Sequence, residues 1–247
     1  MTPAIILIEP QMGENIGAAA RAMENFGLND LRIVNPRDGW PNEKAYAVAA
    51  SATRILDNVT LFSNTNDAVA DLHTLIATTG YTRKMIKPVI TPKEAAQKTM
   101  QAGAQGNRVG LLFGAERTGL ANDDIVRCDS ILVIPTSPDY TSLNLAQAIV
   151  VVAYEWFCAS TSLAQTHGTT GPNATPVNPD LKLATAADVQ GMLDHLESEL
   201  DKADFWKEWK KKPLMWQNLR NIFTRNPLAI QEVRTLRGVI RCLVEGR

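Results

Sequence analysis

The chain has 247 residues, of which 45% are hydrophobic and 21% charged, so it is long enough to bury a core without disulfide support. Its 25 Lys and Arg residues balance 26 Asp and Glu residues, which excludes a uniformly basic coat for nucleic acid but leaves room for a local basic patch. Three scattered cysteines and three scattered histidines predict no metal site, and the lack of a signal peptide or a membrane-length apolar run predicts a cytoplasmic protein.

Short apolar segments alternate with segments of helical spacing in the first two thirds of the chain. We expect strands at residues 4–9, 31–34, 59–62, 74–78, 109–113 and 131–134. We expect helices at residues 14–27, 43–50, 66–72, 92–102, 122–127 and 143–157, and a polar loop at 79–91. Because the expected strands are continuously apolar, they predict a mostly parallel α/β sheet with helices on both faces.

The helix expected at 143–157 is the longest of these. Its helical spacing predicts a buried face made of Leu143, Ala146, Val150, Ala153 and Phe157. Thr141 or Ser142 is expected to cap its N-terminus, since hydroxyl side chains accept hydrogen bonds from the first backbone N–H groups of a helix.

The composition changes after residue 160. Residues 161–184 are rich in Thr, Pro, Asn and Gly and predict a flexible linker between a domain at 1–160 and a helical extension at 185–247. Within the extension, residues 186–203 and 218–243 have helical spacing.

The C-terminal extension is also basic. Ten Lys and Arg stand against three Asp and Glu from residue 205 onward, and Lys210, Lys211 and Lys212 are adjacent. This pattern is typical of an arm that holds RNA phosphates. It also fits a tail that packs on the body or on a partner chain, with Trp206, Trp209 and Trp216 buried and the lysines merely solvated.

The familiar catalytic motifs are missing. Gly114 and Gly119 have the spacing of a phosphate-binding P-loop, but Leu120 and Ala121 stand where Lys and Ser or Thr are needed. The sequence also lacks the GxGxxG, GxSxG and HExxH patterns. These absences argue against NTPases, classical dehydrogenases, α/β-hydrolases and metalloproteases.

Three other motifs begin where expected strands end, which is where open parallel sheets bind ligands. The first holds Asn15, Gly17 and Arg21. Arg21 lies off the apolar stripe of its helix, and Gly17 would let another group approach the backbone closely. The structural alternative is a solvated Arg21 paired with Glu24 at helical spacing.

The second motif is the segment LLFGAERTGL at residues 111–120. Gly114 and Gly119 bracket Glu116 and Arg117 directly after a buried strand. Such an arrangement exposes backbone groups to a ligand, although an ordinary glycine-rich turn would look the same.

The third motif runs from residue 133 to 148 and contains two prolines that stiffen the loop before the long helix. Ser142 and Asn144 place a hydroxyl and an amide near the N-terminus of that helix. A plain helix cap is the structural alternative, and it is compatible with ligand binding.

Taken in this order, the three motifs resemble those of the SPOUT (SpoU-type) RNA 2′-O-ribose methyltransferases. The residues that carry the resemblance are Asn15, Gly17, Arg21, Phe113, Gly114, Glu116, Arg117, Gly119, Leu120, Ile134, Pro135, Ser142, Leu143, Asn144 and Ala146. The tail, with its FWKEW and NLRNIF segments, is similar to that of the bacterial enzymes that methylate cytidine or uridine at tRNA position 32.

The resemblance implies a Rossmann-like sheet whose C-terminal part is tied in a deep trefoil knot, with S-adenosylmethionine bound in the knot. The implied cofactor-binding residues are Thr78, Thr79, Gly80, Phe113, Gly114, Gly119, Ile134, Pro135, Thr141, Ser142 and Leu143. It also implies a homodimer in which Arg21 of one chain faces the cofactor of the other. Because the cofactor residues precede the linker, cofactor binding is expected not to need the extension.

The resemblance assigns catalysis to Arg21, supported by Asn15, Glu116, Ser142 and Asn144. A guanidinium group is a poor base, so we interpret Arg21 as a clamp that stabilises the developing alkoxide of the ribose. The expected RNA-binding residues are Arg83, Lys84, Arg117, Tyr140, Lys210, Lys211 and Lys212. For Tyr140, stacking on a base and packing within its loop both remain open.

Two classes of function therefore remain. One is a ribose methyltransferase that acts on tRNA or, as the runner-up, on ribosomal RNA. The other is a non-catalytic RNA-binding module of the same fold. The presence of Arg21, Glu116, Ser142 and Asn144 favours the enzyme.

Overall fold

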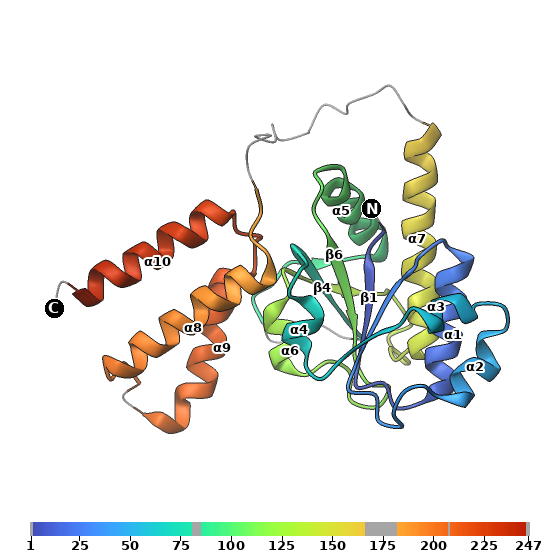
Figure 1. Ribbon diagram of the computed structural model, residues 1–247, viewed down its shortest axis with the longest axis horizontal. Helices are drawn as coiled ribbons and strands as arrows, with labels where there is room; N and C mark the ends of the chain where they lie inside the picture. Colours follow the sequence, from blue (N-terminus) through green and yellow to red (C-terminus); the bar gives the residue numbers. More distant parts are fainter. Residues whose placement is uncertain (1, 81–84, 166–181, 207, 246–247) are drawn as a thin grey trace.

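A seven-stranded, entirely parallel sheet forms the body of the protein (Figure 1). The computed structural model describes residues 2–80, 85–165, 182–206 and 208–245. The strands are β1 (Ala4–Ile8), β2 (Asp30–Val34), β3 (Thr60–Phe62), β4 (Thr74–Thr79), β5 (Val89–Ile90), β6 (Val109–Phe113) and β7 (Ser130–Val133). Their order is β3-β2-β1-β6-β4-β7-β5, which confirms the predicted mostly parallel sheet. The expected trefoil knot concerns the path of the chain after β7 and stays a prediction.

Helices cover both faces of this sheet. They are α1 (Gly13–Asn25), α2 (Glu43–Ala49), α3 (Thr53–Asp57), α4 (Thr65–Val69), α5 (Pro92–Ala104), α6 (Asn122–Arg127) and α7 (Leu145–Gln165). Alternate side chains of β1 point to opposite faces, as the pleat of a strand requires. Ile5 and Leu7 pack in the core beneath α1, α2, α5 and α7, whereas Ile6 and Ile8 pack in the core beneath α4 and α6.

Two elements of the body escaped the sequence prediction. The helix α3 was not expected, and the segment expected to be a polar loop at 79–91 contains the edge strand β5. Val89 and Ile90 of β5 pair with Ile131 and Leu132 of β7. A strand of two residues is too short to show an alternating pattern, so periodicity could not reveal it.

The long helix α7 differs from its prediction in its limits and in its buried face. It begins at Leu145 rather than at Leu143, and it continues to Gln165, into the expected linker. Leu145, Ile149, Val152, Ala153 and Trp156 are buried against the sheet, whereas Val150 and Phe157 are exposed. The predicted face was wrong in part because this helix is apolar on several sides, so its spacing does not single out one of them.

Gly17 serves the packing of two helices. A Cβ atom at this position would lie 2.1 Å from the carbonyl oxygen of Ala45 in α2. The group that approaches the Gly17 backbone closely is therefore α2, and any larger residue would push α1 and α2 apart.

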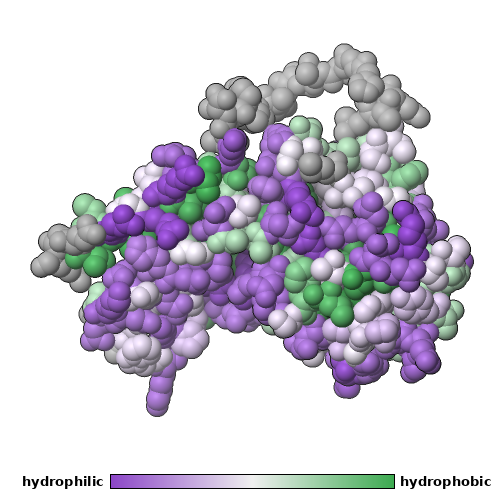
Figure 2. All heavy atoms as spheres, in the orientation of Figure 1, coloured by the Kyte–Doolittle hydropathy of each residue, from purple (hydrophilic) through white to green (hydrophobic). Residues whose placement is uncertain are grey.

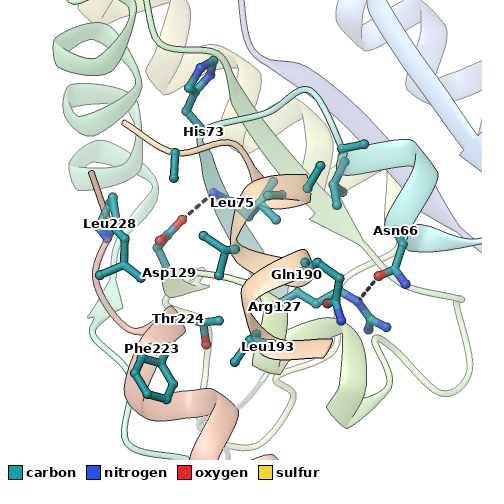
Figure 3. A pocket seen from close by; sticks show the side chains of 18 of the residues that line it. Asn66, His73, Leu75, Arg127, Asp129, Gln190, Leu193, Phe223, Thr224 and Leu228 are labelled. Carbon is teal, nitrogen blue, oxygen red and sulfur yellow. Dashed lines mark hydrogen bonds between the residues drawn. The ribbon is translucent and has the colours of Figure 1, made fainter. Parts of the chain in front are cut away.

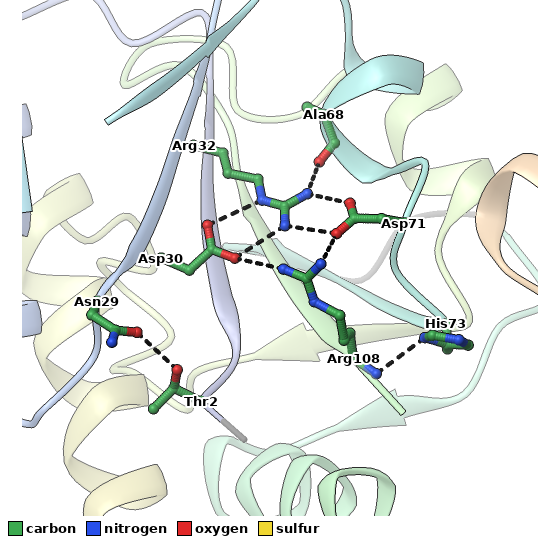
Figure 4. Close-up of polar contacts among 8 residues, drawn as sticks. All are labelled: Thr2, Asn29, Asp30, Arg32, Ala68, Asp71, His73 and Arg108. Carbon is green, nitrogen blue, oxygen red and sulfur yellow. Dashed lines mark hydrogen bonds and ion pairs between the residues drawn. The ribbon is translucent and has the colours of Figure 1, made fainter. Parts of the chain in front are cut away.

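An ion network around the buried Arg32 joins β2 to the segments next to α4 and β6 at the amino end of the sheet (Figure 4). Arg32 of β2 donates to Asp30, to the carbonyl of Ala68 at 2.7 Å and to Asp71 at 2.5 Å, and Arg108 contacts both carboxylates. Hydrogen bonding to Arg32 lowers the pKa of Asp71. An arginine inside a strand is tolerated here because the carboxylates and the carbonyl accept its N–H donors.

In the described part of the C-terminal extension there are three helices, of which two lie beside α4 and α6 and the last packs on the first (Figure 1). They are α8 (Ala186–Lys202), α9 (Lys212–Thr224) and α10 (Ile230–Glu245), with a 3-10 turn at Trp209–Lys211. The single helix expected at 218–243 is thus two helices, separated where Pro227 removes a backbone donor. Ala184, Met192, Leu193 and Val233 form the small core of the extension.

The expected linker at 161–184 lies partly outside the described residues, which resume at Lys182. Leu183 pairs with Ala229 in a short bridge, and the backbone N–H of Ala184 donates to Leu228 at 2.8 Å. Residues 182–184 of the expected linker thus contact the segment that leads into α10, and the division of the chain into domain, linker and extension stays a prediction. In the described part of the chain, no helix is long and apolar enough to cross a membrane.

Candidate active site

A cavity of about 230 Å³ opens at the carboxyl ends of β4, β6 and β7. Its walls come from residues 78–80, 113–120, 132–134 and 141–148. The expected cofactor-binding residues that line it are Thr78, Thr79, Gly80, Phe113, Gly114, Gly119, Ile134, Thr141, Ser142 and Leu143. Pro135 is exposed and lies outside the lining. Because parallel strands place their carboxyl ends at one edge, loops far apart in sequence meet here.

A chain of hydrogen bonds joins the three motifs beside this cavity. The Glu116 carboxylate accepts from the backbone N–H of Gln11 at 2.7 Å and of Met12 at 3.2 Å, and from the amide of Asn15 at 2.7 Å. The Asn15 oxygen in turn accepts from the amide of Asn144 at 2.9 Å. The structure therefore gives Glu116 and Asn15 a role in joining the motif loops, rather than a contact with Arg21.

Asn144 also caps α7. Its side-chain oxygen accepts from the backbone N–H of Ala146 at 2.9 Å and of Gln147 at 3.4 Å. The expectation that Thr141 or Ser142 caps this helix was therefore wrong. Both hydroxyl residues are exposed and line the cavity instead, which leaves them accessible to a ligand.

Arg21 is exposed on α1, away from the buried stripe of that helix. The alternative that Arg21 pairs with Glu24 fails, because Arg54 binds Glu24 at 3.2 Å. Arg21 forms no ion pair with any residue that the structure describes. Its guanidinium group is free to meet another molecule.

The expected RNA-binding residues are dispersed. Arg117 is exposed at the rim of the cavity, and Tyr140 is 77% exposed in the loop before α7. Packing within that loop therefore does not account for Tyr140. Arg83 and Lys84 lie outside the described residues.

The three adjacent lysines of the tail differ from one another. Lys210 and Lys211 are exposed, and Lys211 pairs with Glu208. Lys212 contacts Glu197 at 3.2 Å and Asp201 at 2.7 Å, and its ammonium lies 4.9 Å from the centre of the Trp209 ring. Lys212 therefore holds the tail together and is the least available of the three for RNA.

The tryptophans of the tail differ in how far they are exposed. Trp206 is 1% exposed, and its indole N–H donates to Asp201 at 2.6 Å, so it belongs to the packing of the tail. Trp216 packs edge-on against Trp206, whereas Trp209 is 61% exposed. The packing alternative thus holds for Trp206 and Trp216, and only Trp209 offers an open aromatic face.

A second cavity, of about 270 Å³, lies at the opposite edge of the sheet between the body and the tail (Figure 3). Asp129 in its wall is buried and accepts a hydrogen bond from the backbone N–H of Leu75 at 2.6 Å. Burial raises the pKa of Asp129 to about 6 because the carboxylate loses its water. Sequence spacing gave no signal for this carboxyl group.

Replacing Asp129 by asparagine is expected to stabilise the protein at pH 8. The raised pKa means that Asp129 stabilises the fold while protonated and that this contribution is lost as the pH rises from about 4 through 6. Asparagine stays neutral and can still accept from Leu75. The gain should therefore grow between pH 4 and 6 and level off at about 1–3 kcal/mol.

Chemical denaturation of both proteins at a series of pH values measures this gain. The matched control is Asp123→Asn, which removes an exposed carboxylate from the neighbouring helix and should leave the pH dependence unchanged. A constant difference between wild type and Asp129→Asn from pH 4 to pH 8 would show that Asp129 titrates normally.

Comparison with known proteins identifies relatives over nearly the whole chain. Residues 3–154 match the SpoU rRNA methylase family, and residues 187–245 match the C-terminal domain of the tRNA methyltransferase TrmJ. The tRNA (cytidine/uridine-2′-O-)-methyltransferase TrmJ of Citrobacter koseri is 34% identical over 96% of this chain and 93% of its own length.

Solved structures give the same result. The crystal structure of TrmJ from Z. mobilis ZM4 superposes with a TM-score of 0.84 at 42% identity and covers 98% of this chain and 99% of that one. A probable methylase family protein from Haemophilus influenzae has a TM-score of 0.63 at 30% identity, with 99% and 96% coverage. Likeness thus extends through both the body and the tail.

Proposed function

Since this chain belongs to the SpoU methylase family and carries a TrmJ-type C-terminal domain, we propose that it transfers a methyl group from S-adenosylmethionine to a ribose 2′-hydroxyl in tRNA. The observation that carries this proposal is the cavity lined by the second and third motifs, to which the first motif is joined by the hydrogen bonds of Asn15 with Glu116 and Asn144. The TrmJ-type tail favours tRNA over ribosomal RNA as the substrate. The target is a cytidine or uridine, at position 32 of the anticodon loop, and the enzyme acts in the cytoplasm.

The residues around the cavity fit S-adenosylmethionine. Leu132, Ile134 and Leu143 offer apolar surface on which a flat adenine ring can pack, and the exposed hydroxyls of Thr141 and Ser142 offer hydrogen bonds to its polar groups. When bound, the cofactor supplies a methyl group on a positively charged sulfur.

The protein contributes position and charge to the reaction. The target hydroxyl must lose its proton while the new bond between oxygen and methyl carbon forms. Arg21 holds the phosphate and the hydroxyl of the target nucleotide, so its positive charge stabilises the developing alkoxide. Glu116, Asn15 and Asn144 act behind this site by holding the motif loops in register. Correct placement of reacting groups contributes roughly 7–11 kcal/mol to such a transfer.

Incubation with labelled S-adenosylmethionine and total tRNA, followed by mass spectrometry of the nucleosides, tests the function. We expect 2′-O-methylated cytidine or uridine from tRNA and no product from ribosomal RNA. Methylation of a base, or of ribosomal RNA alone, would contradict the proposal, and binding of tRNA without any product would indicate a non-catalytic RNA-binding module.

The active form is proposed to be a homodimer, in which Arg21 of one protomer completes the site of its partner. Val150, Tyr154 and Phe157 are exposed along one face of α7, and Phe26 packs against the last two with ring centres 6.0 Å apart. Large apolar side chains gathered on one surface are typical of an interface.

Replacing Phe157 by aspartate is expected to yield a monomer that has lost methyltransferase activity. A charge in the middle of an apolar interface would leave an unpaired carboxylate on association. Light scattering should then give a mass near 27.0 kDa. The control is Leu61→Asp, which changes an exposed apolar residue on the edge strand β3 and should remain a dimer. Active wild-type monomers would contradict the proposal.

The tail is proposed to bind tRNA through arginines of α10. Arg234, Arg237 and Arg241 recur at spacings of three and four, so they share one face, and all three are exposed. Figure 2 shows strongly hydrophilic atoms along this helix. Within the described residues none of the three forms an ion pair, whereas Lys211 and Lys212 do.

Changing Arg234, Arg237 and Arg241 together to glutamine is expected to weaken tRNA binding and flatten its salt dependence. Each lost phosphate contact reduces the slope of log K against log salt by roughly 0.7–0.9. Binding titrations between low and moderate salt measure the slope. The control removes the same charge from the body with Lys44→Gln, Arg54→Gln and Lys93→Gln. An unchanged slope in the α10 variant would show that this face does not contact RNA.

A further inference from the structure

The buried lysine Lys87 joins the tail to the body. Its ammonium donates to the carbonyls of Val126 at 3.1 Å and Cys128 at 2.5 Å, and to the hydroxyl of Thr224 in α9 at 3.0 Å. The residue is only 7% exposed. Three acceptors thus satisfy three N–H donors, and one of them comes from the tail.

The side chains of α9 that face the body repeat this contact along one side of the helix. The Thr224 hydroxyl donates to the carbonyl of Val126 at 2.5 Å, and the Asn221 amide donates to the carbonyl of Ile86 at 3.0 Å. One turn earlier, the amide of Gln217 donates to Asp123 at 3.3 Å. Side chains at spacings of three and four lie on one helix face, so this face of α9 is hydrogen-bonded to the body from Gln217 to Thr224.

The body residues that α9 contacts lie just before two neighbouring strands, β5 and β7. Residues 86–87 lie between the end of β4, where Gly80 lines the cavity, and the strand β5. Residues 126–128 lead into β7, which ends at the cavity with Leu132 and Ile134. The tail therefore contacts, at the amino edge of the sheet, the residues that precede β5 and β7, and the carboxyl end of β7 lines the cavity.

The strand β5 is poorly held by the sheet alone. It contains two residues and lies at the edge of the sheet, where β7 is its one strand partner among the residues that the structure describes. A ladder this short contributes little by itself, so the position of β5 depends on what fixes its ends. Lys87, two residues before β5, is bound both to α9 and to the C-terminal end of α6, just before β7, and supplies that fixed point.

We propose that Thr224 and Lys87 are positioning residues for methyl transfer, through which the docked helix α9 holds the β5–β7 edge and so sets the geometry of the cofactor cavity. This inference rests on the proposed function and replaces the expectation that cofactor binding is independent of the tail. The tail then does more than hold RNA, since its docking and the binding of S-adenosylmethionine favour each other.

Thr224→Val tests this inference because valine keeps the shape of threonine and removes the hydroxyl. A buried ammonium would lose one acceptor, which is costly, so α9 should separate from Lys87. We expect Lys87 to be acylated at least tenfold faster by an amine-reactive reagent, measured by mass spectrometry. We also expect the Kd of S-adenosylmethionine to rise about five- to tenfold and kcat to fall, with the KM for tRNA changed less.

Two controls separate positioning from general damage. Thr224→Ser keeps the hydroxyl and should restore wild-type values for all three measurements. Thr235→Val removes a threonine hydroxyl from α10 that donates only to the carbonyl of Gln231 in its own helix, and it should have no effect. Exposure of Lys87 in Thr224→Val with unchanged cofactor affinity and kcat would overturn the proposal, and so would an unreactive Lys87.

A measurement on the wild-type chain keeps the inference testable if Thr224→Val does not fold. Coupling between two sites is reciprocal: if docking of α9 tightens the binding of S-adenosylmethionine, then bound S-adenosylmethionine favours the docked state by the same factor. Lys87 is accessible only when α9 is undocked, so saturating S-adenosylmethionine should slow acylation of Lys87 by that factor. Equal acylation rates with and without S-adenosylmethionine would overturn the coupling. This assay contains no RNA, so it can show the coupling even when no tRNA is methylated. A failure of the proposed function can therefore be told apart from a failure of this inference.

Discussion

Replacing Arg21 by alanine is expected to reduce kcat/KM for tRNA methylation by about 10²–10³-fold, the usual loss when a group that stabilises a developing oxyanion is removed. The free energy of unfolding should change by less than about 0.5 kcal/mol, because surface substitutions away from special features have small effects. The structure supports this separation, since Arg21 is exposed and Glu24, its nearest sequence partner, is bound by Arg54. Methyl incorporation and thermal unfolding measure the two quantities.

Arg54→Ala is the matched control for Arg21→Ala. It also removes an exposed guanidinium, and it breaks the ion pair with Glu24, yet it should leave methylation unchanged. Arg21→Lys keeps the charge but loses the forked geometry of the guanidinium, so it should restore only part of the activity. Near-normal turnover in Arg21→Ala would reject the assigned role, and a large loss of stability would indicate that Arg21 supports the fold instead.

The parallel sheet and the position of the cavity could be predicted from sequence because both follow from local pattern. Continuous apolar runs separated by helical segments leave few arrangements other than a covered parallel sheet. In such a sheet every strand ends at the same edge. Residues after β4, β6 and β7 therefore had to meet, and Gly80, Gly114 and Ile134 line one cavity.

The contacts that hold this site together could not be predicted in the same way. Asn15 lies more than 100 residues before both Glu116 and Asn144, and spacing along the chain does not reveal which of these side chains will touch. Asn144, rather than a hydroxyl residue, caps α7 because its amide also reaches Asn15. In the sequence, Asn144 is one of several residues able to cap this helix, and nothing in the local pattern reveals its long-range contact with Asn15.

The tail shows a second reason why sequence patterns fall short. Charge counting selected Lys210, Lys211 and Lys212, since three adjacent lysines are conspicuous. Acidic residues of α8 neutralise Lys212 in the folded tail, and Glu208 pairs with Lys211. The arginines of α10 stand out only when their common helix face is known. Net charge of a segment is thus a weak guide to which cations are available.

Gly114→Val is expected to weaken S-adenosylmethionine binding by roughly 100-fold or more, equivalent to about 2.7 kcal/mol. Because the segment after β6 is expected to expose its backbone to a ligand, a side chain at Gly114 would also occupy the space of the cofactor. The structure gives another cause, since a Cβ atom at Gly114 would lie 2.2 Å from the backbone of Gly119 and Leu120. No side chain rotation relieves a clash between a Cβ and the main chain, so the loop must open.

Opening this loop would disturb more than one wall of the cavity. The backbone N–H of Gly119 donates to the carbonyl of Ala115 at 2.7 Å, which closes the turn around Glu116. If the turn opens, Glu116 moves away from the N–H groups of Gln11 and Met12, and the amide N–H of Asn15 loses its acceptor. The loss of affinity should therefore be accompanied by a loss of kcat for whatever cofactor still binds.

Titration calorimetry of Gly114→Val, with thermal unfolding to establish that the variant is folded, measures this effect. Gly238→Ala is the control, because Gly238 lies in α10 with open space around its Cβ position. Alanine there should leave cofactor affinity unchanged and stabilise the helix by about 0.5–1 kcal/mol. A folded Gly114→Val protein with wild-type affinity for S-adenosylmethionine would show that the loop at Gly114 is not part of the cofactor site, because a turn that can open without consequence cannot be what holds the cofactor.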